Sequence, residues 1–138
     1  MSGSVESRLP ELTARARAAQ ARAYAPYSKF RVGAALLSTN GTIIDGCNVE
    51  NASYPAGTCA ERVALGAAVV AGHRAFSAVV ITTDAPEGTP PCGICRQALA
   101  EFGTSLQIIA VTHDGRETRW TLDALLPHPF TPSSLHTR

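Results

Sequence analysis

The chain has no excess of charge of either sign and few aromatic side chains. It carries 12 Lys and Arg against 11 Asp and Glu, so its formal net charge is only +1, and 6% of its residues are aromatic. A nucleic-acid-binding domain usually gathers basic residues on one face. Here they are scattered, apart from Arg15, Arg17 and Arg22. We therefore expect no nucleic-acid partner.

The chain also lacks an apolar run long enough to cross a bilayer, and its first twenty residues do not resemble a signal peptide. These absences predict a cytoplasmic protein without a membrane partner. Thiols stay reduced in the cytoplasm, where cysteines serve more often as metal ligands or buried apolar residues than in disulfides. The question is which cysteines hold a metal among Cys47, Cys59, Cys92 and Cys95.

Size and composition predict one folded domain over residues 1–138. Hydrophobic residues make up 45% of the chain and charged residues 17%, which favours a packed core over disorder. A domain this small has little concave surface of its own. A deep site would therefore need help from a neighbouring subunit.

The order of predicted elements indicates an α/β fold. Asn40-Gly41 between two β-rich runs predicts a hairpin, and residues 79–81 read as a strand buried on both faces. Pro10 is placed in the first turn of the first helix, and Thr58 is taken as the N-cap of the second. Helices are expected at residues 9–23, 59–71, 92–102 and 122–126, and strands at 30–37, 42–47, 79–81, 106–112 and 117–120. This order predicts one mixed sheet of five strands covered by helices.

Two short motifs carry the chemistry, and both fall at predicted helix N-termini. They are Thr58-Cys59-Ala60-Glu61-Arg62 and Pro91-Cys92-Gly93-Ile94-Cys95-Arg96-Gln97. The C-x-x-C places two sulfurs about one turn apart on one helix face, where the helix dipole favours thiolates. A third cysteine at another helix start completes a three-thiolate site for zinc, whose fourth position stays open for water.

Three thiolates make zinc a weak Lewis acid, so the site needs compensating positive charge. We expect Arg62 and Arg96 to supply part of it by pairing with the sulfurs. Hydrolysis also needs a proton carrier beside the water. Glu61 lies two residues after Cys59, so its carboxylate can reach a group bound at the metal.

The alternative is a closed, structural zinc site with Cys47 as fourth ligand, in an interaction domain. Cys47 ends a strand of apolar neighbours and is interpreted here as a buried thiol. Structural sites of four cysteines usually show two C-x-x-C pairs, and this chain has one. The open site is therefore preferred.

The chain resembles the short, homotetrameric cytidine deaminases. Zinc deaminases carry a metal ligand, a Glu two residues later, and a later P-C-x-x-C. Cys59-Ala60-Glu61 and Pro91–Cys95 match this pattern with Cys in place of His, and residues 25–35, residues 46–52 and Phe130 extend the likeness over nearly the whole chain. The resemblance implies a three-layer α-β-α sandwich and one Zn²⁺ per chain, held by Cys59, Cys92 and Cys95.

The activity implied is hydrolysis of cytidine and deoxycytidine to uridine and deoxyuridine with release of ammonia. Zinc hydroxide would attack C4 of cytosine while Glu61 protonates N3 and then the departing ammonia. The same chemistry on another substrate, such as a nucleoside antibiotic or a base in single-stranded nucleic acid, remains an alternative. Near-neutral charge opposes the nucleic-acid version.

The resemblance also assigns the substrate contacts. Asn48 and Glu50 would hold the ribose 3′-hydroxyl, since an amide and a carboxylate together recognise a hydroxyl. Phe30 would line the base pocket, and the backbone near Ala60 would read the base edge. Without the resemblance, Asn48 and Glu50 would read as loop residues and Phe30 as core.

Parts of each pocket would come from neighbouring subunits of the homotetramer. Tyr54 would be the loop aromatic that crosses the interface. Phe130 would cover the base of a neighbour's substrate, although by itself it reads as an exposed residue of a Pro-rich tail.

Overall fold

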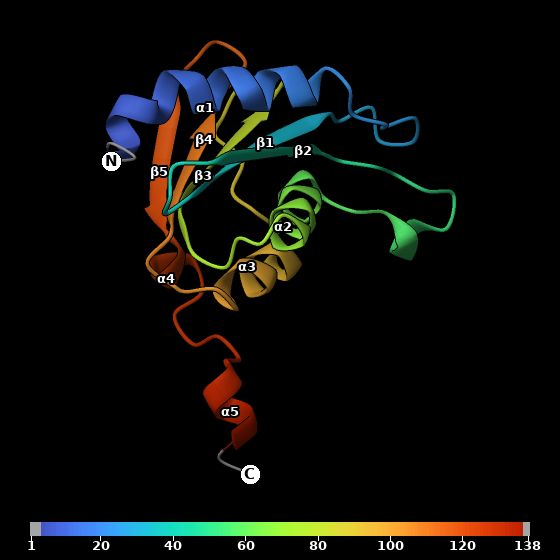
Figure 1. Ribbon diagram of the computed structural model, residues 1–138. Helices are drawn as coiled ribbons and strands as arrows, with labels where there is room; N and C mark the ends of the chain where they lie inside the picture. Colours follow the sequence, from blue (N-terminus) through green and yellow to red (C-terminus); the bar gives the residue numbers. More distant parts are fainter. Residues whose placement is uncertain (1–3, 137–138) are drawn as a thin grey trace.

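The computed structural model describes residues 4–136, which form one five-stranded mixed sheet in the order β2-β1-β3-β4-β5 (Figure 1). β3 and β4 are parallel, and every other neighbouring pair is antiparallel. The strands are β1 (Val32–Ser38), β2 (Ile43–Cys47), β3 (Phe76–Thr83), β4 (Gln107–Val111) and β5 (Glu117–Thr121). The predicted mixed sheet is confirmed.

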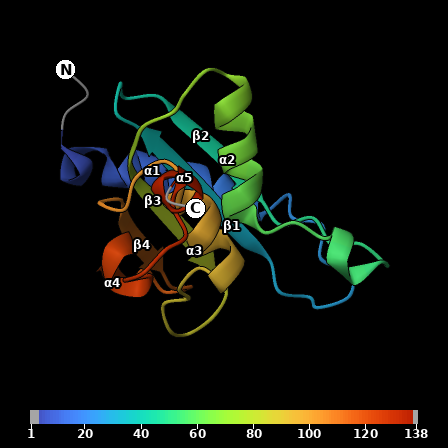
Figure 2. The ribbon, with the colours of Figure 1, turned by 90° about the horizontal axis from the view of Figure 1, so that it is seen from below.

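Helices cover both faces of the sheet, as the three-layer prediction requires. α1 (Val5–Gln20) lies on one face, while α2 (Ala60–Val70) and α3 (Gly93–Ala100) lie next to each other on the other (Figures 1 and 2). The shorter helices are η1 (Tyr54–Ala56), α4 (Leu122–Leu125) and α5 (Pro132–His136). No helix within residues 4–136 is both long and apolar enough to span a membrane.

Buried apolar side chains form one cluster on each face, and β3 contributes to both. Val79 and Ile81 pack with α2 and α3, whereas Val80 packs beneath α1. Alternate residues of a strand point to opposite faces, and all three side chains are at most 2% exposed. The prediction of a strand buried on both faces is confirmed.

The first helix begins and ends earlier than predicted. Ser4 is its N-cap, because the Ser4 hydroxyl accepts a hydrogen bond from Ser7 N–H at 3.2 Å. Pro10 therefore lies inside α1 and not in its first turn. The helix stops at Gln20, three residues before the predicted end.

Two other helix starts also differ from the predictions. Cys59, not Thr58, occupies the N-cap position of α2. α5 was not predicted within the Pro-rich tail, but Pro132 suits a first helical position, where its missing N–H costs nothing.

Gly46 lets α2 lie directly on β2. A Cβ at this position would be 2.6 Å from Ala64 N and 2.7 Å from Ala60 O. Both are backbone atoms of α2, so they cannot give way as the end of a flexible side chain can. The absence of a side chain at Gly46 thus sets how close the first turn of α2 lies to the sheet.

Gly46→Ala should lower the free energy of unfolding by about 1–3 kcal/mol, the usual cost of overpacking a filled core. The added methyl group can enter only if α2 moves away from β2. Urea or thermal unfolding measures the loss. An unchanged unfolding midpoint would mean that α2 is not seated on the strand as described.

Candidate zinc centre and active site

Three cysteine sulfurs converge where α2 and α3 begin. Cys59 is the N-cap of α2, Cys92 is the N-cap of α3, and Cys95 lies in the first turn of α3. The three sulfur atoms all lie within 4.8 Å of one another, and Cys59 Sγ is 3.9 Å from Cys92 Sγ. A tetrahedral zinc with Zn–S bonds of about 2.3 Å separates its sulfurs by about 3.8 Å. The donor set and its spacing therefore fit zinc.

Cys47 does not belong to this group. Within residues 4–136, no other group of three or more candidate metal ligands is found. It is half-buried beside Ala19, Arg22 and Val63, in a separate hollow between α1, β2 and α2. Burial raises the pKa of the Cys47 thiol, with a further contribution from the charge of Asp45. A closed site with Cys47 as fourth ligand is therefore not what the fold builds.

The sulfurs are arranged for a cation, because thiolates this close together repel one another. The hydrogen bond between Cys95 and Cys59 lowers the pKa of Cys59 to about 5 and raises that of Cys95. Arg62 also lowers the pKa of Cys59. A divalent cation removes the repulsion and lets all three cysteines bind as thiolates.

Glu61 is a buried carboxyl next to the sulfurs. Its side chain is in the first turn of α2, and the residue is only 5% exposed. Loss of water contact, together with the nearby charge on Cys59, raises the pKa of Glu61 to about 7. A carboxyl so placed can both accept and donate a proton near neutral pH.

Arg62 pairs with the ligand set as predicted. Its Nη2 lies 3.6 Å from Cys59 Sγ, a distance suited to a hydrogen bond to sulfur. Hydrogen bonding to the Cys59 and Cys95 sulfurs in turn raises the pKa of Arg62. The guanidinium thus supplies positive charge beside a sulfur-rich metal site.

The predicted pairing of Arg96 with the cysteine sulfurs is wrong. Its Nε donates to Pro91 O at 2.8 Å, and its Nη1 donates to Leu125 O at 3.0 Å. The guanidinium is therefore directed at backbone carbonyls before α3 and at the end of α4. It fixes the chain that leads into Cys92 rather than the charge on the sulfurs.

A cavity of about 260 Å³, here called the central cavity, opens onto the sulfurs and Glu61. Four residues predicted for substrate binding lie in its wall. They are Phe30, Asn48, Glu50 and Ala60. The remaining lining residues come from loops, from β1 and β3 and from the starts of α2 and α3, and they are Ser28, Val32, Cys59, Glu61, Ile81, Thr89, Pro90 and Cys92.

Asn48 holds the loop that carries Phe30. Asn48 Oδ1 accepts from Val32 N–H at 2.8 Å, and Asn48 Nδ2 donates to Phe30 O at 2.8 Å. Lys29, just before Phe30, has a left-handed φ of 63°, which costs a non-glycine residue on the order of 1 kcal/mol. The Asn48 amide thus supports a turn that is unfavourable by itself.

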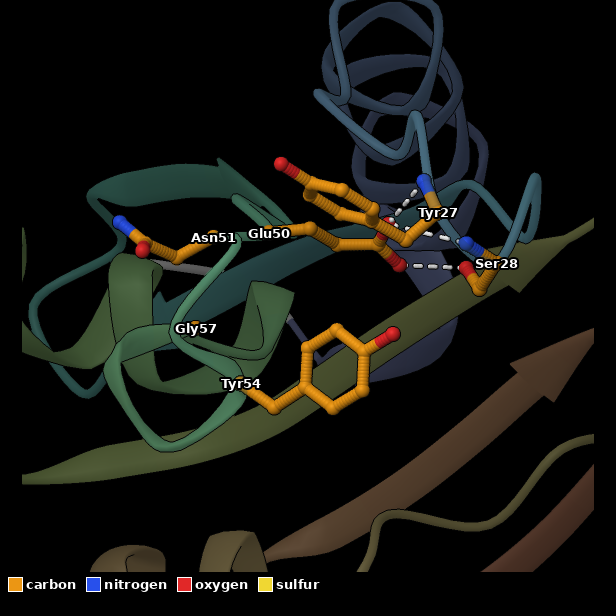
Figure 3. A pocket seen from close by; sticks show the side chains of 6 residues that line it. All are labelled: Tyr27, Ser28, Glu50, Asn51, Tyr54 and Gly57. Carbon is orange, nitrogen blue, oxygen red and sulfur yellow. Dashed lines mark hydrogen bonds between the residues drawn. The ribbon is translucent and has the colours of Figure 1, made fainter.

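Glu50 holds the same loop a few residues earlier in the chain. Its carboxylate accepts from Tyr27 N–H at 3.0 Å, from Ser28 N–H at 3.1 Å and from the Ser28 hydroxyl (Figure 3). The Ser28 hydroxyl and the two backbone N–H groups lower the pKa of Glu50. The carboxylate is therefore ionised at neutral pH and faces the central cavity.

Tyr54 lies in a neighbouring hollow, which shares Ser28 and Glu50 with the central cavity (Figure 3). Its ring meets that of Tyr27 edge to face, with centroids 6.1 Å apart. Tyr54 is 76% exposed as a residue and is not among the residues lining the central cavity.

Phe130 also lies outside the central cavity of its own chain. It is 47% exposed, and its backbone is hydrogen-bonded to the Gln97 side chain of α3. Tyr54 and Phe130, both predicted to serve a neighbouring subunit, are thus the two predicted substrate-binding residues that the central cavity does not contain.

Sequence reasoning missed several lining residues. Ser28 lies inside the segment that carried the family likeness, so its position was a usable signal. Ile81 read only as core, and Thr89 lies in a loop without a pattern of its own. The Thr89 hydroxyl is 3.3 Å from the Thr83 hydroxyl at the end of β3, a contact that only the fold reveals.

An α/β fold with a three-thiolate zinc site opening into a cavity beside a buried carboxyl defines the class of zinc-dependent deaminases. The family model described as "Cytidine and deoxycytidylate deaminase zinc-binding region" matches residues 7–111. The chain belongs to this family, and Cys59, Cys92 and Cys95 bind its zinc.

Individual relatives agree with this assignment. A cytidine deaminase of Sporosarcina psychrophila is 43% identical over 126 residues, which cover 91% of this chain and 93% of that protein. The crystal structure of a cytidine deaminase from Burkholderia pseudomallei matches with a TM-score of 0.84 and 42% identity, covering 88% of this chain and 98% of that one. A cytidine deaminase structure from Mycobacterium tuberculosis matches with a TM-score of 0.75 and 40% identity, covering 88% and 96% of the two chains.

Separate replacement of Cys59 and of Cys47 distinguishes an open zinc site from a closed one. Cys59→Ser should lose most of its zinc, because one of three thiolate ligands is gone. Cys47→Ser, the matched control, should keep one zinc per chain. Metal analysis after gel filtration measures both. Loss of zinc from Cys47→Ser would contradict the three-ligand site.

Proposed function

We propose that this protein hydrolyses the amino group of free cytidine and deoxycytidine, giving uridine or deoxyuridine and ammonia. The observation that carries the proposal is the zinc-binding triad of Cys59, Cys92 and Cys95 at one end of a cavity that also holds Glu61. The activity matches the name that the relatives above share.

The proposed chemistry divides between the metal and Glu61. Zinc, when bound, acts as a Lewis acid that makes water a nucleophile at neutral pH. Glu61 takes a proton from the attacking water and gives it to N3 of the cytosine ring. It then moves a second proton to the amino group that leaves from C4 as ammonia. Its burial next to the sulfurs suits a group that must transfer two protons in each turnover.

We assign the base to the inner part of the central cavity and the ribose to its outer part. Phe30 would pack against the base, and the backbone at Ala60 would contact its edge. Asn48 and Glu50 would bind the ribose 3′-hydroxyl with the hydrogen-bonding capacity left over from the loop, since a carboxylate offers about four acceptor positions. Their contacts with the loop give both side chains fixed orientations before substrate arrives.

The lining of the central cavity favours a free nucleoside over a nucleotide. Its residues include no Lys or Arg, and Glu50 would repel a phosphate at the ribose end. The overall charge of +1 gives no general attraction for polyanions. Another nucleoside with a 4-amino pyrimidine ring, such as a nucleoside antibiotic, is the second candidate substrate.

We also infer that the protein is a homotetramer with shared active sites. The outer face of α2 supports self-association, because an apolar stripe without charge runs along it at helical spacing. The stripe consists of Val63, Gly66, Ala67 and Val70, and Val70 is 91% exposed. Apolar helix faces of this kind are normally buried against another element. Tyr54 and Phe130 would then reach the cavities of neighbouring copies.

A cytoplasmic location follows from the same proposal. Three zinc-binding thiolates must remain reduced, which the glutathione and thioredoxin of the cytoplasm ensure. The pyrimidine nucleosides that it would salvage are also small cytoplasmic metabolites.

A substrate panel tests the proposed function. Cytidine and deoxycytidine should lose their amino group, with one ammonia released for each uridine or deoxyuridine formed. Cytosine, adenosine and CMP should be poor substrates, CMP because nothing in the cavity neutralises a phosphate. Absorbance and ammonia assays follow the reaction. Turnover of CMP equal to that of cytidine would contradict the assignment of the ribose end.

Glu61→Gln tests the proton carrier. The amide is nearly the same size but cannot take up a proton, so kcat should fall by a factor of about 10²–10⁴, the usual contribution of general acid–base catalysis. Zinc content should stay at one ion per chain, because Glu61 is not a ligand. An active Glu61→Gln enzyme would rule out the proposed role.

The oligomer can be tested at the α2 stripe. Wild-type protein should have a mass of about 58 kDa by light scattering, four times the 14.4 kDa of one chain. Ala67→Glu puts a charge in the stripe and should reduce this mass. Ala14→Glu, on the exposed side of α1, is the matched control and should leave it unchanged. A wild-type monomer that is fully active would refute the shared sites.

A further inference from the structure

Gln97 of α3 ties the C-terminal segment to the body of the protein through two hydrogen bonds. Gln97 Nε2 donates to Phe130 O at 2.7 Å, and Phe130 N–H donates to Gln97 Oε1 at 3.3 Å. One planar amide thus satisfies both backbone groups of the same residue. Such a pair fixes the orientation of the Phe130 backbone as well as its position.

The chain on either side of Phe130 is held as well. Arg96, the residue before Gln97, donates to Leu125 O, so α3 anchors both ends of residues 125–130. After Phe130, Thr131 N–H donates to the Ser134 hydroxyl at 3.2 Å and Thr131 O accepts from Ser134 N–H at 2.9 Å, which closes the first turn of α5. The Phe130 backbone therefore has little freedom.

Phe130 is nevertheless 47% exposed as a residue and absent from the lining of the central cavity of its own chain. The segment that carries it runs away from the sheet and ends in α5 (Figure 1). A large aromatic ring on a firmly held backbone loses little entropy when it docks on another molecule. A second copy of this chain is the partner that the proposed function requires.

We propose that Gln97 is a positioning residue for the reaction, which sets the place of Phe130 so that its ring covers the base in the central cavity of a neighbouring copy. This inference rests on the proposed function. Gln97 lies two positions after the ligand Cys95 in the same short helix, so the two hydrogen bonds join the metal-binding helix of one copy to the aromatic lid of another copy's site.

The test compares Gln97→Leu, Phe130→Ala and the double variant, with cytidine as substrate. Gln97→Leu keeps a side chain of similar size and removes both hydrogen bonds. It should raise KM for cytidine about tenfold and change kcat by less than about twofold, because a loosely placed ring covers the bound base less often. Zinc content and oligomer mass should match wild type.

The double variant separates positioning from a general structural role. If Gln97 acts through Phe130, adding Gln97→Leu to Phe130→Ala should produce no further rise in KM. Gln97→Glu keeps the acceptor for Phe130 N–H but loses the donor, so its KM should be intermediate. Glu101→Gln, at the exposed C-cap of the same helix, is the control and should behave as wild type.

Two kinetic results would overturn the inference while leaving the deaminase intact. One is wild-type KM in Gln97→Leu, and the other is a full additional rise in KM when Gln97→Leu is combined with Phe130→Ala. Loss of zinc or of the oligomer in Gln97→Leu would also count against it, because the residue would then support the fold rather than the lid. Wild-type protein without activity on cytidine would instead refute the proposed function itself.

Discussion

Three sulfur atoms within 4.8 Å of one another are the constraint on which the rest of the structure depends. Such a cluster is stable as thiolates only around a cation. Two helix N-termini, α2 and α3, bring the sulfurs together and direct their dipoles at the negative charge. Arg62 adds a positive charge from the side. The close seating of α2 on β2 at Gly46 then determines where Cys59 and Glu61 stand relative to Cys92 and Cys95.

The wall of the central cavity includes residues that stabilise loops and also face the cavity. Asn48 and Glu50 each bind backbone groups of residues 27–32, and each also lines the central cavity. Because the same side chains bind the loop and line the cavity, the loop contacts hold these polar groups in fixed orientations, and no large surrounding domain is needed. This arrangement also explains how a chain of 138 residues can hold a defined pocket, while Tyr54 and Phe130 lie outside that pocket.

Local patterns in the sequence predicted most of the fold and the metal ligands. The Asn40-Gly41 turn, the apolar run at 79–81 and the C-x-x-C spacing each depend on interactions between near neighbours. The predictions were wrong where contacts between residues far apart in the sequence determine the local structure. Cys59 is the N-cap of α2, with Thr58 instead pairing with Val49. Arg96 binds Leu125 O, 29 positions away, and Gln97 binds Phe130, 33 positions away. No periodicity or propensity encodes such pairs, so the fold alone reveals them.

The central claim is that zinc in this protein has three sulfur ligands and one position open to water. X-ray absorption spectroscopy of the zinc-loaded protein tests it most directly, because it counts sulfur and oxygen neighbours separately. Three sulfurs at about 2.3 Å and one lighter atom at about 2.0 Å are expected around the zinc. Four sulfurs around the metal would contradict the claim, since the site would then be closed to water.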